Sequence, residues 1–259
     1  MADPVRLERA DGLAELVLDC PPLNLFDRAL IDSLIAAVDD VRADPPRALL
    51  VRAEGRVVSG GVDVALFDGL TPAAASELWT ELLERIVEPI EQLPAPTIFA
   101  AHGLTLTAAF EIALGCDLIL AAESAKFGLV EAVVGLTPSM GGTQRLAERA
   151  GSARARELVM TGELFGAAQL ERWNVVNRVL EDDSFHDRGR ELALKLAAGP
   201  TRAHAMTKHI VRRYLEGGVP AADEAVRSDA GELFATEDLQ RAVRTFLARG
   251  PGHADFHNR

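Results

Sequence analysis

The chain has 259 residues, and its 27 lysines and arginines stand against 39 aspartates and glutamates, a formal net charge of −12. This acidity disfavours binding to nucleic acid or to an anionic membrane surface, because both partners are themselves negatively charged. Hydrophobic residues make up 48% of the chain and charged residues 25%, which is ordinary for a folded globular protein and excludes a largely disordered one.

The first half of the chain predicts strands that alternate with helices. The strand signals are a hairpin over 5–18 that turns at Asp11-Gly12, followed by buried strands at 48–51, 97–101 and 117–121. Helical patterns begin near Asp27, after Thr71-Pro72 and near Thr107, and Pro89 is expected to kink or end the second helix. Repeating strand and helix units of this kind favour right-handed β-α-β crossovers in an α/β fold.

From about residue 144 onward the sequence is mostly helical. Helical patterns cover 144–160, 167–172, 185–198, 201–215 and 221–249, and only 175–179 looks extended. We therefore expect an α/β core over residues 1–200 and a helical region over 201–259, and we expect the latter to pack against a neighbouring subunit.

Many familiar signals are missing from the sequence. Two cysteines, Cys20 and Cys116, are too few for a disulfide framework, and the six histidines lack metal-ligand spacing. Dinucleotide-binding, P-loop, zinc-protease and serine-hydrolase motifs are absent. Because the start of the chain has no secretory pattern and no apolar run reaches about 18 residues, we expect a cytoplasmic protein without a membrane anchor.

Three segments carry the most specific signal. They are Ser-Gly-Gly-Val-Asp at 59–63, His-Gly-Leu-Thr-Leu-Thr-Ala-Ala-Phe-Glu at 102–111, and Phe-Gly-Leu-Val-Glu at 127–131, which runs on to Pro-Ser-Met-Gly-Gly-Thr-Gln-Arg at 138–145. In this order and spacing they resemble the crotonase superfamily, the enoyl-CoA hydratase/isomerase family, over nearly the whole chain. The resemblance implies a crotonase-like (ClpP/crotonase) spiral of β-β-α units with a helical C-terminal region, assembled as a homotrimer or a dimer of trimers.

The resemblance also implies a site that binds an acyl-CoA thioester and stabilises its enolate. The backbone N–H groups of Val62 and Ala108 correspond to the oxyanion hole of the family, and the neighbouring Gly61, Asp63, Val64 and Ala65 to substrate contacts. A helix N-terminus suits such a donor, since its first N–H groups lack internal partners and its dipole favours negative charge.

Glu111 and Glu131 correspond to the acid/base pair of the family. Each lies among apolar neighbours, although a single glutamate on a helix is more often an exposed surface residue. Two carboxylates in one enclosed site are expected to have at least one raised pKa, which suits a general acid near neutral pH. Trp79 is a candidate for the acyl pocket, for the core or for a subunit contact.

The sequence departs from the family pattern near the proposed oxyanion hole. Thr107, Ala108 and Ala109 stand where the family usually has two or three glycines, and the added methyl groups narrow the approach of the thioester. Val62 is bulkier than usual, and Ala65 stands where a lysine or arginine is common. These changes affect the expected substrate preference more than the expected type of reaction.

The leading hypothesis is an enoyl-CoA hydratase that adds water to a 2-trans-enoyl-CoA and gives a 3-hydroxyacyl-CoA, as in β-oxidation. CoA would enter as part of the substrate, with no metal or redox cofactor. One alternative is an enoyl-CoA isomerase that uses Glu131 as its main base, and another is a non-catalytic acyl-CoA-binding paralogue.

Overall fold

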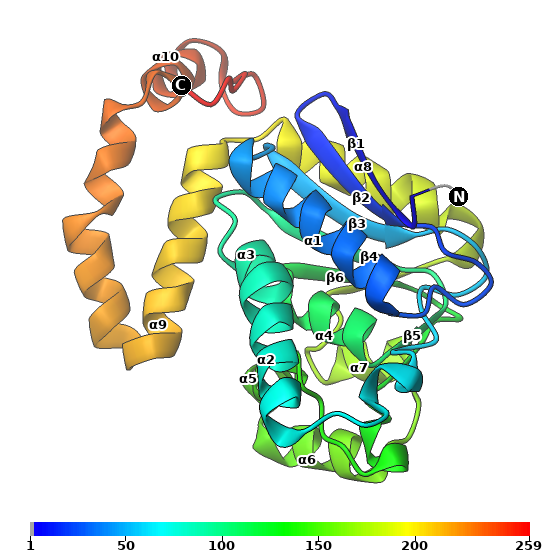
Figure 1. The fold of residues 1–259 in the computed structure, drawn as a ribbon. Coiled ribbons are helices and arrows are strands. Elements are labelled where there is room, and N and C mark those ends of the chain that lie inside the picture. The colour runs from blue at the N-terminus through cyan, green and yellow to red at the C-terminus, as the bar shows by residue number, and fades with distance from the viewer. Residues whose placement is uncertain (1–2) are drawn as a thin grey trace.

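A six-stranded sheet forms the centre of the protein in the computed structural model, which describes residues 3–259 (Figure 1). Its strand order is β1-β2-β3-β4-β6-β9, and the pairs after the first are parallel. The antiparallel hairpin of β1 and β2 turns at Asp11-Gly12, as predicted. The strands are β1 (Val5–Ala10), β2 (Leu13–Leu18), β3 (Ala48–Ala53), β4 (Thr97–Ala101), β6 (Leu118–Ala122) and β9 (Arg178–Leu180).

A second, smaller sheet was not predicted from the sequence. Its order is β5-β7-β8, with β5 and β7 parallel and β7 and β8 antiparallel. Strands of two or three residues are too short to show a periodic pattern, so the sequence gives no sign of them. They are β5 (Leu104–Leu106), β7 (Lys126–Gly128) and β8 (Phe165–Gly166).

The helices of the first half begin where the sequence indicated. The side chain of Asp27 caps α1 (Arg28–Ala43), and the side chain of Thr71 caps α2 (Pro72–Leu82). Before Pro89 the chain forms one π-helical segment, η2 (Leu83–Val87), and then continues as α3 (Glu88–Glu91), so the expected irregularity is a change of helical winding.

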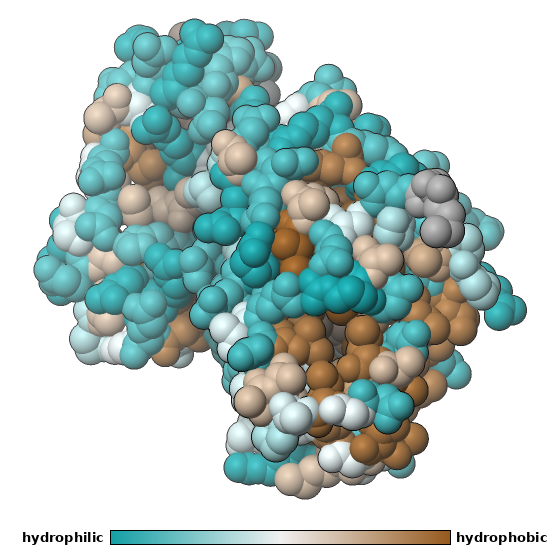
Figure 2. Space-filling model, in the orientation of Figure 1, coloured by the Kyte–Doolittle hydropathy of each residue, from teal (hydrophilic) through white to brown (hydrophobic). Residues whose placement is uncertain are grey.

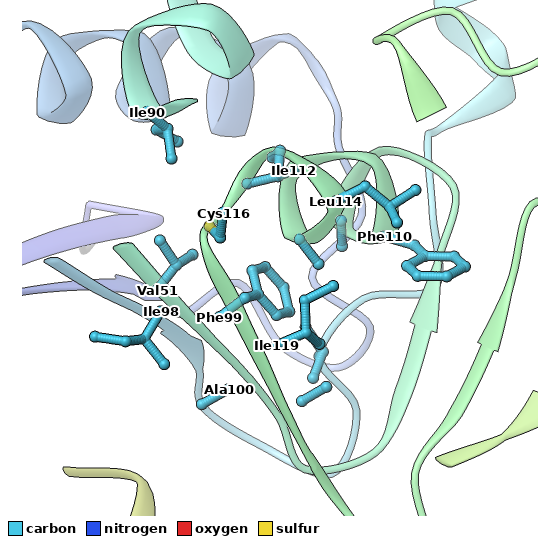
Figure 3. Close-up of a cluster of buried hydrophobic side chains, with 14 of the residues drawn as sticks. Val51, Ile90, Ile98, Phe99, Ala100, Phe110, Ile112, Leu114, Cys116 and Ile119 are labelled. Carbon is cyan, nitrogen blue, oxygen red and sulfur yellow. The ribbon is translucent and has the colours of Figure 1, made fainter. Parts of the chain in front are cut away.

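One short helix, α4 (Ala108–Gly115), lies at the heart of the molecule, and all eight of its residues are buried. Figure 3 shows apolar side chains of α4, among them Phe110 and Ile112, together with Val51, Phe99 and Ile119 from the large sheet. A helix that is apolar on every side is stable only inside a core. This position fixes the N-terminus of α4 deep in the protein.

The C-terminal half is helical, as expected. The stretch predicted over 144–160 divides at Gly151, and Gly217-Gly218 breaks the long helix α9. Figure 1 shows α9 and α10 extending away from the sheet. The helices are α5 (Gly142–Ala150), α6 (Ser152–Thr161), α7 (Ala167–Arg172), α8 (Phe185–Ala197), α9 (Thr201–Ser228) and α10 (Glu237–Arg249).

Short 3-10 turns join several of these elements, and they are η1 (Val64–Phe67), η3 (Glu131–Val134), η4 (Asp182–Ser184) and η5 (Ala230–Ala235). The α9 helix begins at Thr201, but the division into parts 1–200 and 201–259 stays a prediction. Among residues 3–259, no helix has the length and apolar character needed to cross a bilayer.

Candidate active site

Glu111 lies on α4 and is almost completely buried, with 2% of its surface exposed. One oxygen of its carboxylate, Oε2, accepts hydrogen bonds from the backbone N–H groups of Met140 and Gly142, both at 2.8 Å. Burial raises the pKa of Glu111 to about 7, although these N–H groups favour its ionised form and oppose the rise. The side chain is therefore a buried, oriented carboxyl group that titrates near neutral pH.

Glu131 is the first residue of η3, which follows β7. Both of its carboxylate oxygens are buried, and neither has a hydrogen-bond partner among residues 3–259. Burial first, and then the negative charge of Glu111, raise its pKa to about 7. Both carboxyl groups line one pocket, so the structure brings together the two glutamates that the sequence singled out.

The two candidate oxyanion donors also converge. The segment that leads to Val62 runs parallel to β5, with a bridge between Ser59 and Thr105 and a bond from the N–H of Leu106 to the carbonyl of Ser59. This pairing carries Val62 alongside the start of α4. Ala108 opens that helix and is completely buried, and as the first helical residue it has no acceptor for its N–H within the helix.

The residue between these donors has an unusual backbone. Thr107 has φ 44° and ψ −119°, a conformation that suits glycine and costs other residues about 1–3 kcal/mol. Its N–H donates to the carbonyl of Gly128, and its carbonyl accepts from the N–H of Glu111. Its hydroxyl oxygen accepts a hydrogen bond of 3.2 Å from the N–H of Val62. From the sequence we expected only that added methyl groups would narrow the approach of the thioester, and we did not predict the contact of the hydroxyl with Val62.

A pocket lies over the two glutamates, and its other wall residues are mostly apolar. Figure 2 shows apolar residues gathered on the lower part of the viewed face, where Figure 1 places α2, α6 and α7. Trp79 is one of the wall residues, and its ring meets that of Phe67 edge to face at 5.7 Å between centroids. The apolar wall residues are Ile31, Val62, Leu66, Phe67, Leu78, Trp79, Leu82, Leu136 and Met140.

The four predicted substrate contacts, Gly61, Asp63, Val64 and Ala65, lie outside the pocket wall. Asp63 caps η1 by accepting a hydrogen bond from the N–H of Ala65, and Val64 is exposed. Gly61 lies beside Thr107, where an added Cβ would come within 2.7 Å of the hydroxyl oxygen. Contacts between these four residues and a substrate stay predictions. Such contacts would involve a part of the substrate that lies outside the pocket.

Two functional neighbours of Glu111 were missed from the sequence. Met140 and Gly142 matter through backbone N–H groups, which every non-proline residue has, so residue type alone does not reveal them. The glycine pair at 141–142 was the available signal, because glycine permits close approach of another group.

The model of the family described as enoyl-CoA hydratase/isomerase matches residues 8–257. The chain belongs to the enoyl-CoA hydratase/isomerase family. Among its relatives is a probable enoyl-CoA hydratase of Rhodobacter capsulatus, 31% identical over 251 residues that cover 96% of each chain. A carnitinyl-CoA dehydratase of Escherichia coli is 33% identical over 231 residues, which cover 88% of this chain and 87% of that protein.

Solved structures of this family confirm the crotonase-like fold. A structure from Geobacillus kaustophilus HTA426 has a TM-score of 0.93 at 27% identity and covers 100% of this chain and 98% of its own. An enoyl-CoA hydratase structure from Mycobacterium smegmatis has a TM-score of 0.88 at 25% identity, with 95% and 96% covered. The protein is thus an enzyme of the enoyl-CoA hydratase/isomerase type.

Proposed function

We propose that this protein hydrates a 2-trans-enoyl-CoA to a 3-hydroxyacyl-CoA. The observation that carries the proposal is the pair Glu111 and Glu131, two carboxyl groups with pKa values raised to about 7 at one apolar pocket. Hydration needs a base that activates water and an acid that protonates the adjacent carbon. Two groups that titrate near neutral pH can supply one of each.

The surroundings of the two side chains favour different roles. Glu111 accepts two backbone hydrogen bonds, which stabilise its ionised form, whereas the oxygens of Glu131 have none among residues 3–259. When the pair holds one proton, that proton therefore resides mainly on Glu131. We assign Glu111 as the base that takes a proton from water, and Glu131 as the acid that gives a proton to the α-carbon.

The enolate formed during hydration places negative charge on the thioester oxygen. As water adds to the β-carbon, negative charge develops on that oxygen, and the N–H groups of Val62 and Ala108 would stabilise it. Protonation of the α-carbon then restores the thioester. The addition of water is redox-neutral, so the proposed reaction requires no redox cofactor. Because the two N–H groups would stabilise the charge and the two glutamates would move the protons, we propose that no metal takes part, and CoA serves only as the carrier of the acyl group.

The apolar wall of the pocket suits the acyl chain of such a substrate. Trp79 and Phe67 lie on this wall and provide aromatic surface for a hydrocarbon tail. We assign the CoA portion to the outer contacts around Gly61, Asp63, Val64 and Ala65. Exposed apolar side chains on α9 and α10, such as Tyr214 and Leu247, support the proposed trimer or dimer of trimers, in which a neighbour would cover them.

The test is an assay with enoyl-CoA thioesters of increasing length, beginning with crotonyl-CoA, which follows the loss of the enoyl absorbance. We expect hydration by the wild type and a loss of about 10²–10⁴-fold in kcat for Glu111→Gln and for Glu131→Gln. The exposed Glu163→Gln is the matched control and should retain full activity. Conversion of a 3-enoyl-CoA without hydration would establish the isomerase instead, and unchanged turnover in both variants would refute the catalytic assignment.

A further inference from the structure

One proposed oxyanion donor already has an acceptor within the protein. The N–H of Val62 donates to the hydroxyl oxygen of Thr107 at 3.2 Å. An N–H group makes one well-aligned hydrogen bond, so it cannot serve a thioester oxygen at full strength while the hydroxyl holds it. A substrate oxygen at this site has to replace the hydroxyl.

The position of the hydroxyl is fixed from several sides. Thr107 is buried with 8% of its surface exposed, and two backbone hydrogen bonds hold its unusual φ and ψ angles. Its branched Cβ restricts rotation about χ1. Gly61 faces the hydroxyl, since an added Cβ there would come within 2.7 Å of the oxygen. The glycine therefore leaves room for this oxygen beside the donor.

We propose that the Thr107 hydroxyl competes with the thioester oxygen for the Val62 N–H and so lowers the affinity of the enzyme for thioester ligands relative to ligands without that oxygen. This inference rests on the proposed function. A neutral thioester carbonyl has little advantage over the hydroxyl as an acceptor, whereas the charged oxygen of the enolate has a large one, because hydrogen bonds to charged acceptors are the stronger kind. The hydrogen bond that has to be broken is the same for both oxygens, so Thr107 lowers the affinity for the thioester and for its enolate by the same cost, which only the charged oxygen clearly outweighs.

The test compares Thr107→Ala with the wild type by calorimetry, using two non-reacting ligands. Butyryl-CoA is a thioester with a carbonyl oxygen, and S-butyl-CoA is the thioether that lacks it. We expect Thr107→Ala to bind butyryl-CoA about tenfold more tightly, a change equivalent to about 1.4 kcal/mol. Binding of S-butyl-CoA should change by less than twofold, because that ligand has no oxygen to place at the Val62 N–H.

Two further variants separate the hydroxyl from other effects. Thr107→Ser keeps the hydroxyl and should bind both ligands as the wild type does. Thr105→Ala removes a buried hydroxyl that donates to the carbonyl of Gly103, two residues earlier in the chain. It is the matched control for loosened packing around a lost threonine hydroxyl. Amide hydrogen exchange gives a readout without ligand, since the Val62 N–H should exchange faster in Thr107→Ala and stay protected in Thr107→Ser.

The outcomes distinguish this proposal from the proposed function. The competitor role is wrong if the wild type hydrates crotonyl-CoA but Thr107→Ala gains the same affinity for both ligands, or gains affinity for neither. The hydratase assignment would then stand. Weaker thioester binding or activity in Thr107→Ala, restored in Thr107→Ser, would make the hydroxyl a donor and overturn the proposal. If neither the wild type nor Thr107→Ala binds or converts any acyl-CoA, the proposed function fails, and this inference fails with it.

Discussion

At the scale of single residues, the two glutamates show how one pocket produces two different carboxyl groups. Burial raises the pKa of both. Glu111 is held in one orientation by the N–H groups of Met140 and Gly142, whereas the buried oxygens of Glu131 have no hydrogen-bond partner among residues 3–259. The difference in hydrogen bonding, and not in residue type, therefore assigns the base and the acid.

This arrangement predicts a bell-shaped dependence of kcat/KM on pH, with its maximum near pH 7. Below the pKa values both carboxyl groups are protonated and no base is present, and above them both are ionised and no acid is present. The two apparent pKa values belong to the coupled pair. Rates of crotonyl-CoA hydration from pH 5 to pH 9 measure the profile. A flat profile over this range would contradict the assigned roles.

The same raised pKa predicts an effect of Glu131 on stability. An unfolded glutamate has a pKa near 4.5, so the folded protein holds this proton more tightly. The advantage is present below pH 4.5 and is lost as the pH rises through about 7. Replacing Glu131 by Gln should therefore stabilise the fold by about 1 kcal/mol at pH 8, after allowance for its partial exposure, and little at pH 5. Urea unfolding at the two pH values tests this, and equal effects at both would contradict it.

At the scale of elements, the sequence predicted what has a repeating pattern. The hairpin, α1 and the strands of the large sheet follow from alternation, apolar stripes and short buried runs. Glu111 was placed among apolar neighbours on a helix that begins near Thr107, but the complete burial of that helix was not predicted. The small sheet β5-β7-β8 and η3 were not predicted, since two to four residues cannot show a period. Their pairing depends on contacts between distant segments.

The turn that opens α5 gives a prediction at this scale. An alanine Cβ at Gly142 would come within 2.7 Å of Cγ and 3.0 Å of Oε2 of Glu111, where no side chain has room. Gly142→Ala should therefore shift the carboxylate, lower kcat by at least about tenfold and destabilise the fold by about 1–3 kcal/mol. Activity and thermal unfolding measure both effects.

The matched control for this substitution is Gly231→Ala, because an added Cβ there meets open space. It should leave kcat and the melting temperature nearly unchanged. If Gly142→Ala behaved in the same way, the close packing of α5 against Glu111 would not position the catalytic carboxylate.

At the scale of the whole molecule, the site is assembled from segments far apart in the chain. Val62, the start of α4 and Glu131 meet because β5 pairs with the 57–62 segment and with β7. The turn at 140–142 joins them through its hydrogen bonds to Glu111. The family resemblance identified the main members of this set from motifs. The family resemblance did not predict the contact between Thr107 and Val62, because that contact depends on a backbone conformation in which the motif usually has glycine.

The net charge of −12 has its consequence at this scale too. CoA is strongly anionic, and the charged residues on the pocket wall, Glu111 and Glu131, are both acidic. Ala65 adds no positive charge at the position where the family resemblance led us to expect a lysine or arginine. Binding of an acyl-CoA therefore works against the field of the protein, which salt screens over about 10 Å at 0.1 M.

We accordingly expect affinity for butyryl-CoA to rise roughly twofold or more as salt increases from about 20 mM to 150 mM. The uncharged N-acetylcysteamine thioester of butyrate is the control, because it keeps the acyl group and the carbonyl but lacks the phosphates, and its affinity should not change. Titration calorimetry at both salt concentrations measures the difference. If instead the affinity for the CoA ester alone falls as salt increases, a local cluster of arginines holds the phosphates. The attraction of that cluster would then outweigh the repulsion by the net charge of the chain.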